Sequence, residues 1–261
     1  MRLSLLLPGS GFPKLRSAVT LLEDEGRRIL VDSGLVDDGE KLVARLAACG
    51  IGPEEVDTII ATHLHYDHCG NHLLFPNAEY LAGASDLEDT RTFIAFFHAD
   101  QSPSKSQTAE LLRSKYESIK EFYVRSIIRE VTRNLAFYNR LLDDERRFTP
   151  LVGPAWLTSG IEIVPTPGHT PGHLSVVAHG ATLENGETGS VLIGGDAVFT
   201  RATVADDREI HLAWDAETYR RTRSELLARY RWVIPGHDGL SDMHAAQQDE
   251  AAPLFASGAV A

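Results

Sequence analysis

The sequence predicts an α/β fold on three observations. Short apolar and β-branched runs alternate with stretches of helical periodicity, most runs end in a turn-rich segment, and this pattern occurs in both halves of the chain. In the first half, we expect strands at 1–8, 18–22, 28–32 and 56–61 and a helix at 39–49. In the second half, we expect strands at 161–164, 174–178, 190–193 and 232–234 and a helix at 216–230. This order favours helices layered on sheets.

The composition is that of a chain able to bury a full core. It has 261 residues, 43% of them hydrophobic, and a formal net charge of −12. Because this charge repels phosphate backbones, it argues against a nucleic-acid partner. The apolar run in Met1–Pro8 is too short for a signal peptide or a membrane span, so we expect a cytoplasmic protein with no membrane partner.

The most informative run follows the strand expected at 56–61 and holds four metal-capable side chains within six residues. Four ligands this close cannot all bind one ion. His63 and His65 can therefore face one cation while Asp67 and His68 face a second, which is the arrangement of two-metal hydrolases. Three more candidate ligands stand in glycine-rich turns after apolar runs: His169, Asp196 and His237.

In this order, the motifs resemble those of the metallo-β-lactamase superfamily of metal-dependent hydrolases, and nearly the whole chain takes part. The resemblance implies an αββα sandwich with the metal loops along one edge, formed by a single domain over 1–261. It also implies a ligand for every position of the two-metal site. The first metal would be held by His63, His65 and His169, the second by Asp67, His68 and His237, and Asp196 would bridge both.

The bridging position also sorts the chain within the superfamily. True β-lactamases have cysteine or serine where this chain has Asp196, so the chain resembles the glyoxalase II, acyl-homoserine lactonase and nuclease branches. The sequence motif at residues 166–173 is most similar to that of the lactonases. Lactonases of that type place a tyrosine three residues after the bridging aspartate, where its hydroxyl supports the substrate carbonyl. This chain has Phe199 there.

A ligand set of histidine and carboxylate without thiolate suits two divalent ions, with zinc preferred and iron or manganese also compatible. Two ions about 3.5–4 Å apart share a hydroxide that can attack an activated ester. Asp67 is expected to orient that hydroxide and to pass a proton to the leaving group. We expect a small-molecule lactone or thioester as substrate. Iron-dependent oxidation of sulfur compounds, β-lactam hydrolysis and phosphodiester cleavage stay open as alternatives.

Several other polar residues are expected to support the metal site or to lie outside it. Asp32 follows the strand at 28–32, where the resemblance implies an acid that holds a metal-binding histidine in its correct tautomer. Cys69 is expected to be a packed thiol, and His173 to support or pack against the site. His211 is a candidate for the substrate pocket. The remaining histidines are expected at the surface or in turns: His72, His98, His179 and His244.

A helical insertion is expected at about 85–150. From Leu112 to Leu142, apolar residues recur every three or four positions, which predicts a long amphipathic helix starting near Gln107. One interpretation is a cap over the metal site, in which Phe96 and Phe97 line the substrate pocket. A second interpretation is a helical pair that joins two subunits in a homodimer, and a third is a packing embellishment.

Overall fold

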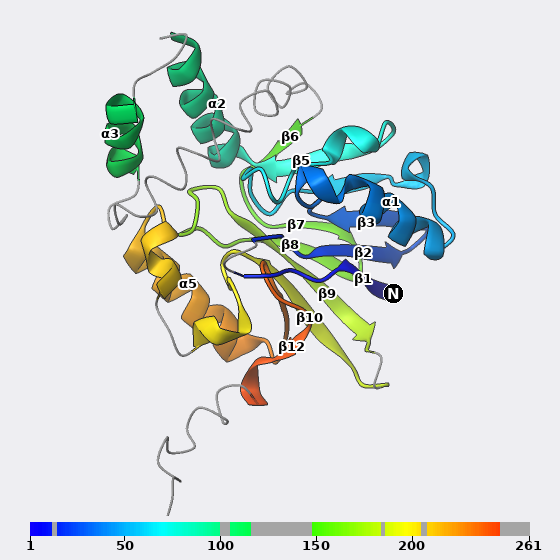
Figure 1. The fold of residues 1–261 in the computed structure, drawn as a ribbon. Coiled ribbons are helices and arrows are strands. Elements are labelled where there is room, and N and C mark those ends of the chain that lie inside the picture. Colours follow the sequence, from blue (N-terminus) through cyan, green and yellow to red (C-terminus); the bar gives the residue numbers. More distant parts are fainter. Residues whose placement is uncertain (12–14, 100–104, 116–147, 184–185, 205–207, 246–261) are drawn as a thin grey trace, which may run out of the picture.

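Two six-stranded mixed sheets face each other in the computed structural model, with helices on their outer faces (Figure 1). The structure describes residues 1–11, 15–99, 105–115, 148–183, 186–204 and 208–245. The predicted αββα sandwich is confirmed. Among the described residues, no helix is both long and apolar enough to cross a bilayer.

The first sheet has the strand order β1-β2-β3-β4-β5-β6. Its strands are β1 Arg2–Leu7, β2 Val19–Asp24, β3 Arg27–Val31, β4 Thr58–Ile60, β5 Glu79–Gly83 and β6 Phe148–Leu151. The pairs among β1, β2 and β3 are antiparallel, and those from β3 to β6 are parallel. Helix α1, Gly39–Ala48, covers the outer face and buries Leu42 and Leu46 against it.

The second sheet has the order β12-β11-β10-β9-β8-β7. Its strands are β7 Ala155–Thr158, β8 Ile161–Pro165, β9 Leu174–Thr182, β10 Thr188–Gly195, β11 Trp232–Pro235 and β12 Ser241–Asp242. Helix α5, Ala216–Arg229, packs Leu226 and Leu227 on its outer face. This helix begins where the Asp215 carboxylate accepts the Thr218 N–H at 2.7 Å, which satisfies one of the free donors of its first turn.

The main core lies between the two sheets. Ile29 and Ile60 of the first sheet are buried in one cluster with Ile163 and Val176 of the second. On β9 the next residue, Val177, points the opposite way and packs under α5. Because successive side chains of a strand alternate between its faces, the first five residues of β9 are buried on both faces of the sheet.

The expected strands and the helices at 39–49 and 216–230 are all present, with ends shifted by a few residues. Within the segment expected to be a helical insertion, at about 85–150, the structure has α2 Ala84–Ala99 and α3 Lys105–Lys115. Near the end of that segment, Phe148–Leu151 pairs in parallel with β5 and completes the sheet. The predicted helical face beyond Lys115 lies outside the described residues.

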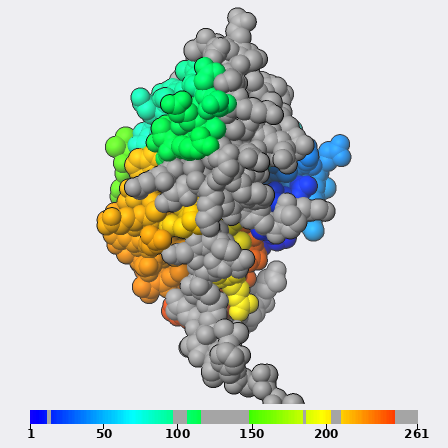
Figure 2. Space-filling model, turned by 60° about the vertical axis from the view of Figure 1, so that its left-hand side comes forward, coloured from blue at the N-terminus to red at the C-terminus, as the bar shows by residue number. Residues whose placement is uncertain are grey.

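Five segments that carry candidate ligands or their support leave the sheets at one edge. Asp32 follows β3, the run from His63 to His68 follows β4, and His169 lies between β8 and β9. Asp196 follows β10 and His237 follows β11. Figure 2 shows the surfaces of α2 and α3 together at one end of the molecule, next to the surface of α5. The sandwich thus brings loops from both sheets to a common point.

Candidate metal centre

The seven predicted ligands come together in three overlapping groups. In each group the ligand atoms lie within 4.8 Å of one another. The groups are His63, His65 and His169; His63, His68 and Asp196; and Asp67, His68 and His237. We call the set His63, His65 and His169 the first half-site and the set Asp67, His68 and His237 the second half-site.

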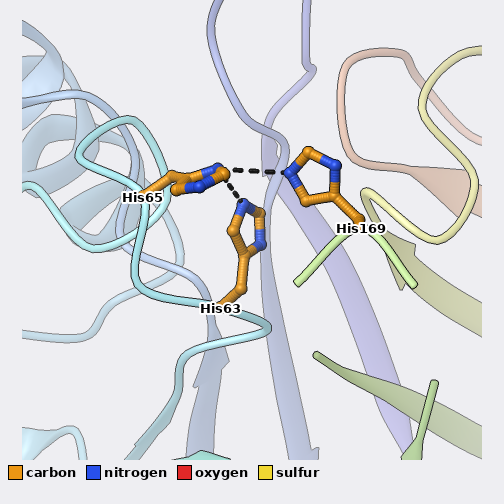
Figure 3. Close-up of side chains that lie close together, drawn as sticks. All are labelled: His63, His65 and His169. Atoms are coloured by element: carbon orange, nitrogen blue, oxygen red, sulfur yellow. Dashed lines mark hydrogen bonds between the residues drawn. The ribbon is translucent and has the colours of Figure 1, made fainter. Parts of the chain in front are cut away.

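The first half-site consists of three imidazoles whose nitrogens converge (Figure 3). His65 Nδ1 lies 2.9 Å from His63 Nε2 and 3.2 Å from His169 Nε2. Burial lowers the pKa of His63 and of His169 well below the ordinary value and lowers the pKa of His65 as well. All three rings are therefore neutral near pH 7, which is the form that binds a metal ion.

The second half-site consists of one carboxylate and two imidazoles. Its imidazoles differ electrostatically from those of the first half-site. His237 Nε2 lies 3.7 Å from Asp67 Oδ2. Burial opposes protonation of His68, but the neighbouring Asp196 and Asp32 carboxylates raise its pKa well above the ordinary value. Burial also opposes protonation of His237, and Asp196 again raises its pKa. Without a bound cation, both rings are therefore easier to protonate than an ordinary histidine.

Asp196 lies between the half-sites and presents one oxygen to each. Its Oδ2 atom is 3.3 Å from His169 Nε2 and 4.0 Å from His63 Nε2. Its Oδ1 atom is 3.2 Å from His68 Nε2 and 3.3 Å from His237 Nε2. Although burial opposes ionisation, His237 and His68 hold the pKa of Asp196 well below its usual value. The carboxylate is thus charged and placed to contact ions in both half-sites.

Two buried atoms show that these residues fit divalent cations. His68 Nε2 and Asp196 Oδ1 are both buried without a hydrogen-bond partner, although they lie only 3.2 Å apart. A buried polar atom without a partner is costly. A cation between the two atoms would satisfy both, and imidazole nitrogen with carboxylate oxygen suits zinc, iron or manganese.

In His68 and His237, the ring nitrogen that faces away from the site also makes a hydrogen bond. The His68 Nδ1 atom lies 2.8 Å from Asp32 Oδ2, and the Asp32 carboxylate accepts the Thr62 N–H at 2.8 Å and the Thr62 hydroxyl at 2.9 Å. His237 Nδ1 donates to the backbone carbonyl of Arg16 at 3.0 Å. Asp32 itself has a φ of 61°, a left-handed conformation unusual for a residue with a side chain. Hydrogen bonds to the far ring nitrogen, such as those of His68 and His237, fix the orientation and tautomer of the ring in metal sites.

Glycine is required beside the Asp196 carboxylate. A Cβ atom at Gly236 would lie 2.0 Å from Asp196 Oδ1, so only glycine lets the β11 turn approach the carboxylate this closely. Gly168 precedes His169 with a φ of 137° and abuts the backbone of Tyr219 in α5. The glycines of the ligand turns therefore permit the close approach of loops that carry the ligands.

Two polar neighbours of the ligands have structural roles. The buried Cys69 thiol donates to the His65 carbonyl at 3.2 Å, and burial raises its pKa well above the usual value, so it behaves as a packed thiol. His173 Nε2 accepts the Asp196 N–H at 3.0 Å, and its Nδ1 lies 2.8 Å from Thr166 Oγ1. These bonds leave no ring nitrogen of His173 to bind a metal.

The other histidines lie away from the ligand groups. His72 was expected at the surface or in a turn, and it lies in the short 3-10 helix His72–Leu74, buried with Nδ1 2.9 Å from the Cys69 carbonyl. His179 is partly buried and pairs with Glu162 at 3.0 Å. His244 is exposed, and the side chain of His98 lies outside the described residues.

The four predicted pocket residues occupy different surroundings. Phe199 is buried, and its ring centroid lies 4.3 Å from that of His237, at the second half-site. Phe96 is partly buried and packs against the core cluster beneath α1. His211 is partly buried in the 3-10 segment Arg208–Leu212. Phe97 belongs to α2, but its side chain lies outside the described residues.

Two residues near the ligands were not predicted. The Trp214 N–H donates to the His169 carbonyl at 3.0 Å, and its side chain is 40% exposed. Asp86 in the first turn of α2 is buried and bonds to the loop that carries His169. The sequence does offer a signal at Trp214, because the next residue, Asp215, is of a type that caps helices and so marks the junction between a loop and a helix. For Asp86, no motif or spacing in the sequence marks the contact.

Comparison with known proteins agrees with this fold. The family model for the metallo-beta-lactamase superfamily matches residues 13–237. An N-acyl homoserine lactonase of Bacillus cereus is 25% identical over 246 residues, which cover 84% of this chain and 79% of that protein. An uncharacterized Caenorhabditis elegans protein is 22% identical over 87% of this chain, which spans only 48% of that protein's length.

Solved structures share the fold. The structure of AidC, a dizinc quorum-quenching lactonase in complex with a product, superimposes with a TM-score of 0.61 at 16% identity, covering 86% of this chain and 74% of that chain. The family match spans most of the sequence, and the described residues bring the histidines and aspartates of the family's motifs together. The chain therefore belongs to the metallo-beta-lactamase superfamily and is a metal-binding hydrolase.

Proposed function

We propose that this protein is a dinuclear metal-dependent hydrolase that cleaves an activated ester, with a lactone as the first candidate and a thioester as the second. The observation that carries the proposal is the position of Asp196, which faces the first half-site with one oxygen and the second half-site with the other. A carboxylate in this position can hold two cations close enough to act on one substrate.

When bound, two divalent cations would polarise the substrate carbonyl and lower the pKa of a water at the site. The protein's own residues orient the reactants and move the proton. Asp67 Oδ2 lies 3.7 Å from His237 Nε2, and the Asp67 side chain is almost fully buried. In the proposed mechanism its carboxylate takes a proton from the attacking water and returns it to the leaving group. Asp32 keeps the His68 ring in place meanwhile.

The lactone candidate is supported by the Bacillus cereus relative, which is an N-acyl homoserine lactonase, and by the sequence motif at residues 166–173. Phe199 supports the thioester candidate, because it offers no hydroxyl to the substrate carbonyl. A thioester needs less help of this kind, since its thiolate leaves readily. We therefore place the lactone slightly ahead of the thioester.

The other reactions of this fold are weaker candidates. Iron-dependent oxidation of sulfur compounds is associated with a single metal, whereas the second half-site has all its groups here. The net charge of −12 disfavours a phosphodiester backbone, and Asp196 replaces the cysteine or serine of β-lactamases. We propose a small-molecule ester as the partner and a cytoplasmic location. A homodimer through the helical insertion remains a prediction.

The test combines metal content with a substrate screen on the full chain. Elemental analysis should give two ions per chain, and lactones, thioesters and a chromogenic β-lactam are then compared as substrates. His169→Ala should lower both metal content and ester hydrolysis, whereas His244→Ala, at an exposed histidine, should change neither. At most one ion with full activity would contradict the proposal. A redox-active iron as sole occupant would support the oxidation of sulfur compounds instead.

A further inference from the structure

Asp86 is a buried carboxylate that the proposed chemistry does not use. It stands in the first turn of α2, three residues after Gly83 ends β5, and only 2% of its surface is exposed. Burial raises the pKa of its carboxyl to about 7 in spite of several hydrogen bonds that lower it. A carboxyl group held in such surroundings must be stabilised by specific donors.

The polar groups around this carboxylate come from both loops that carry the first half-site. Asp86 Oδ2 accepts the Thr170 hydroxyl at 2.8 Å, and Oδ1 accepts the Gly172 N–H at 2.7 Å. Thr170 directly follows His169 in the sequence. The backbone N–H of Leu64, which lies between His63 and His65, faces the same carboxyl group and lowers its pKa. One side chain therefore binds the loop that carries His169 and faces the loop that carries His63 and His65.

The backbone is shaped for this contact. A Cβ atom at Gly83 would lie 1.9 Å from the Gly172 carbonyl oxygen, and a Cβ atom at Gly172 would lie 2.4 Å from the Asp86 nitrogen. Any larger residue would push the His169 loop off the junction between β5 and α2. The junction and the loop are therefore in direct backbone contact, with glycine on both sides.

A local role as a helix cap does not explain these bonds. Asp86 lies in the first turn of α2, but the Thr170 and Gly172 donors lie 84 and 86 residues away in the sequence. Its arrangement also differs from that of Asp32, which bonds directly to the ring of a candidate ligand. Asp86 touches the loops around the ligands instead of the ligands themselves.

We propose that Asp86 is a positioning residue that holds the two loops of the first half-site at a fixed separation and so sets the metal affinity of that half-site alone. Asp32 does the same for the second half-site through His68. This inference rests on the proposed two-metal site. It assigns the start of the helical insertion a part in building the metal centre.

The test is a zinc titration of metal-free protein against a chromophoric chelator, which resolves two successive binding constants. Asp86→Asn keeps the size of the side chain but replaces one acceptor oxygen with a donor. One of the two zinc constants should weaken by about 10- to 100-fold, and the other should stay within about twofold. Glu88→Gln makes the same chemical change at an exposed position of the same helix and should leave both constants unchanged.

Nuclear magnetic resonance of the histidine rings identifies which half-site responds. In metal-free Asp86→Asn, the signals of His65 and His169 should shift, whereas those of His68 and His237 should not. Thr170→Val, which removes one donor and leaves the carboxyl group intact, should reproduce part of the affinity loss and also serves if Asp86→Asn does not fold. Unchanged constants, or equal weakening of both, would overturn the inference. If the wild-type protein binds only one zinc, the two-metal proposal fails, while the ring signals still test Asp86.

Discussion

The first half-site is fixed through its loops, and the second half-site is fixed through its rings. In the first, the buried Asp86 carboxyl group accepts hydrogen bonds from the loop that carries His169 and faces the Leu64 N–H between His63 and His65. In the second, Asp32 lies 2.8 Å from the His68 ring, and the Arg16 carbonyl accepts from the His237 ring. The comparison indicates that two neighbouring cation sites at one edge of the fold can be held in place by different kinds of contact.

The electrostatics differ in the same way. The first half-site contains three rings whose pKa values burial lowers, so a cation meets neutral ligands there. In the second half-site, the pKa values of His68 and His237 are raised by Asp196, so a cation competes with protons there. Asp196 serves both half-sites. A change at Asp196 should therefore affect the two together, whereas changes at the supports should separate them.

The largest expected effect comes from the contact that both half-sites share. Gly236→Ala places a methyl group 2.0 Å from Asp196 Oδ1, so the Asp196 carboxylate or the β11 turn must move. Turnover should fall by at least about 10²-fold, because displacements near 1 Å can cost that much. Elemental analysis should also show fewer than two ions per chain. Gly239→Ala, three residues away with open space around it, is the matched control and should behave as the wild type.

Next comes the residue that gives the second half-site its chemical role. Asp67→Asn should lower turnover by about 10² or more, because it removes the group that orients water and transfers the proton. Folding should survive, as judged by circular dichroism. Asp37→Asn, at an exposed aspartate, controls for the change of charge. Wild-type turnover of Asp67→Asn at unchanged metal content would show that this role is wrong.

A smaller effect is expected from the support of the second half-site. Asp32→Asn weakens the hydrogen bonding of His68 and should cost about 10- to 100-fold in one zinc constant, with little change in the other. Chelator competition measures both constants. The affected constant should be the one that Asp86→Asn leaves alone. If the two variants weaken the same constant, the half-sites are not supported independently.

The sequence was informative about the residues that bind and less informative about those that hold the binding residues. The ligand motifs and the long strands could be predicted because their apolar runs and turn glycines are local. Strands β6, β7 and β12 have four, four and two residues, and their pairing depends on partners elsewhere in the chain. Asp86 could not be found in the same way, since its donors at Thr170 and Gly172 are distant in sequence.

Substrate choice should respond to a residue outside both half-sites. If the start of the insertion lines the pocket, Phe96→Ala or Phe97→Ala should change the ratio of rates on long and short acyl substrates by about tenfold, since apolar pockets discriminate by about 1–3 kcal/mol per methylene. Metal content should stay the same. Leu73→Ala, at an exposed apolar residue elsewhere, provides the control. Equal rate ratios in both phenylalanine variants would favour the dimer or packing interpretation of the insertion.

The smallest expected effect concerns Phe199, whose ring packs beside His237 in the second half-site. Removing one preorganised donor from a carbonyl-activating site commonly costs about 2.7–4 kcal/mol, but a newly added hydroxyl lacks the surroundings that would aim it, so the gain should be much smaller. Phe199→Tyr should raise lactone hydrolysis by about threefold to tenfold and leave thioester hydrolysis nearly unchanged, because the thiolate leaves readily without that help. Both rates are measured on the same preparation, so the thioester rate is the internal control. A folded variant with both metals that gains nothing on any lactone would move the preferred substrate to the thioester, and would imply that the cations alone activate the carbonyl.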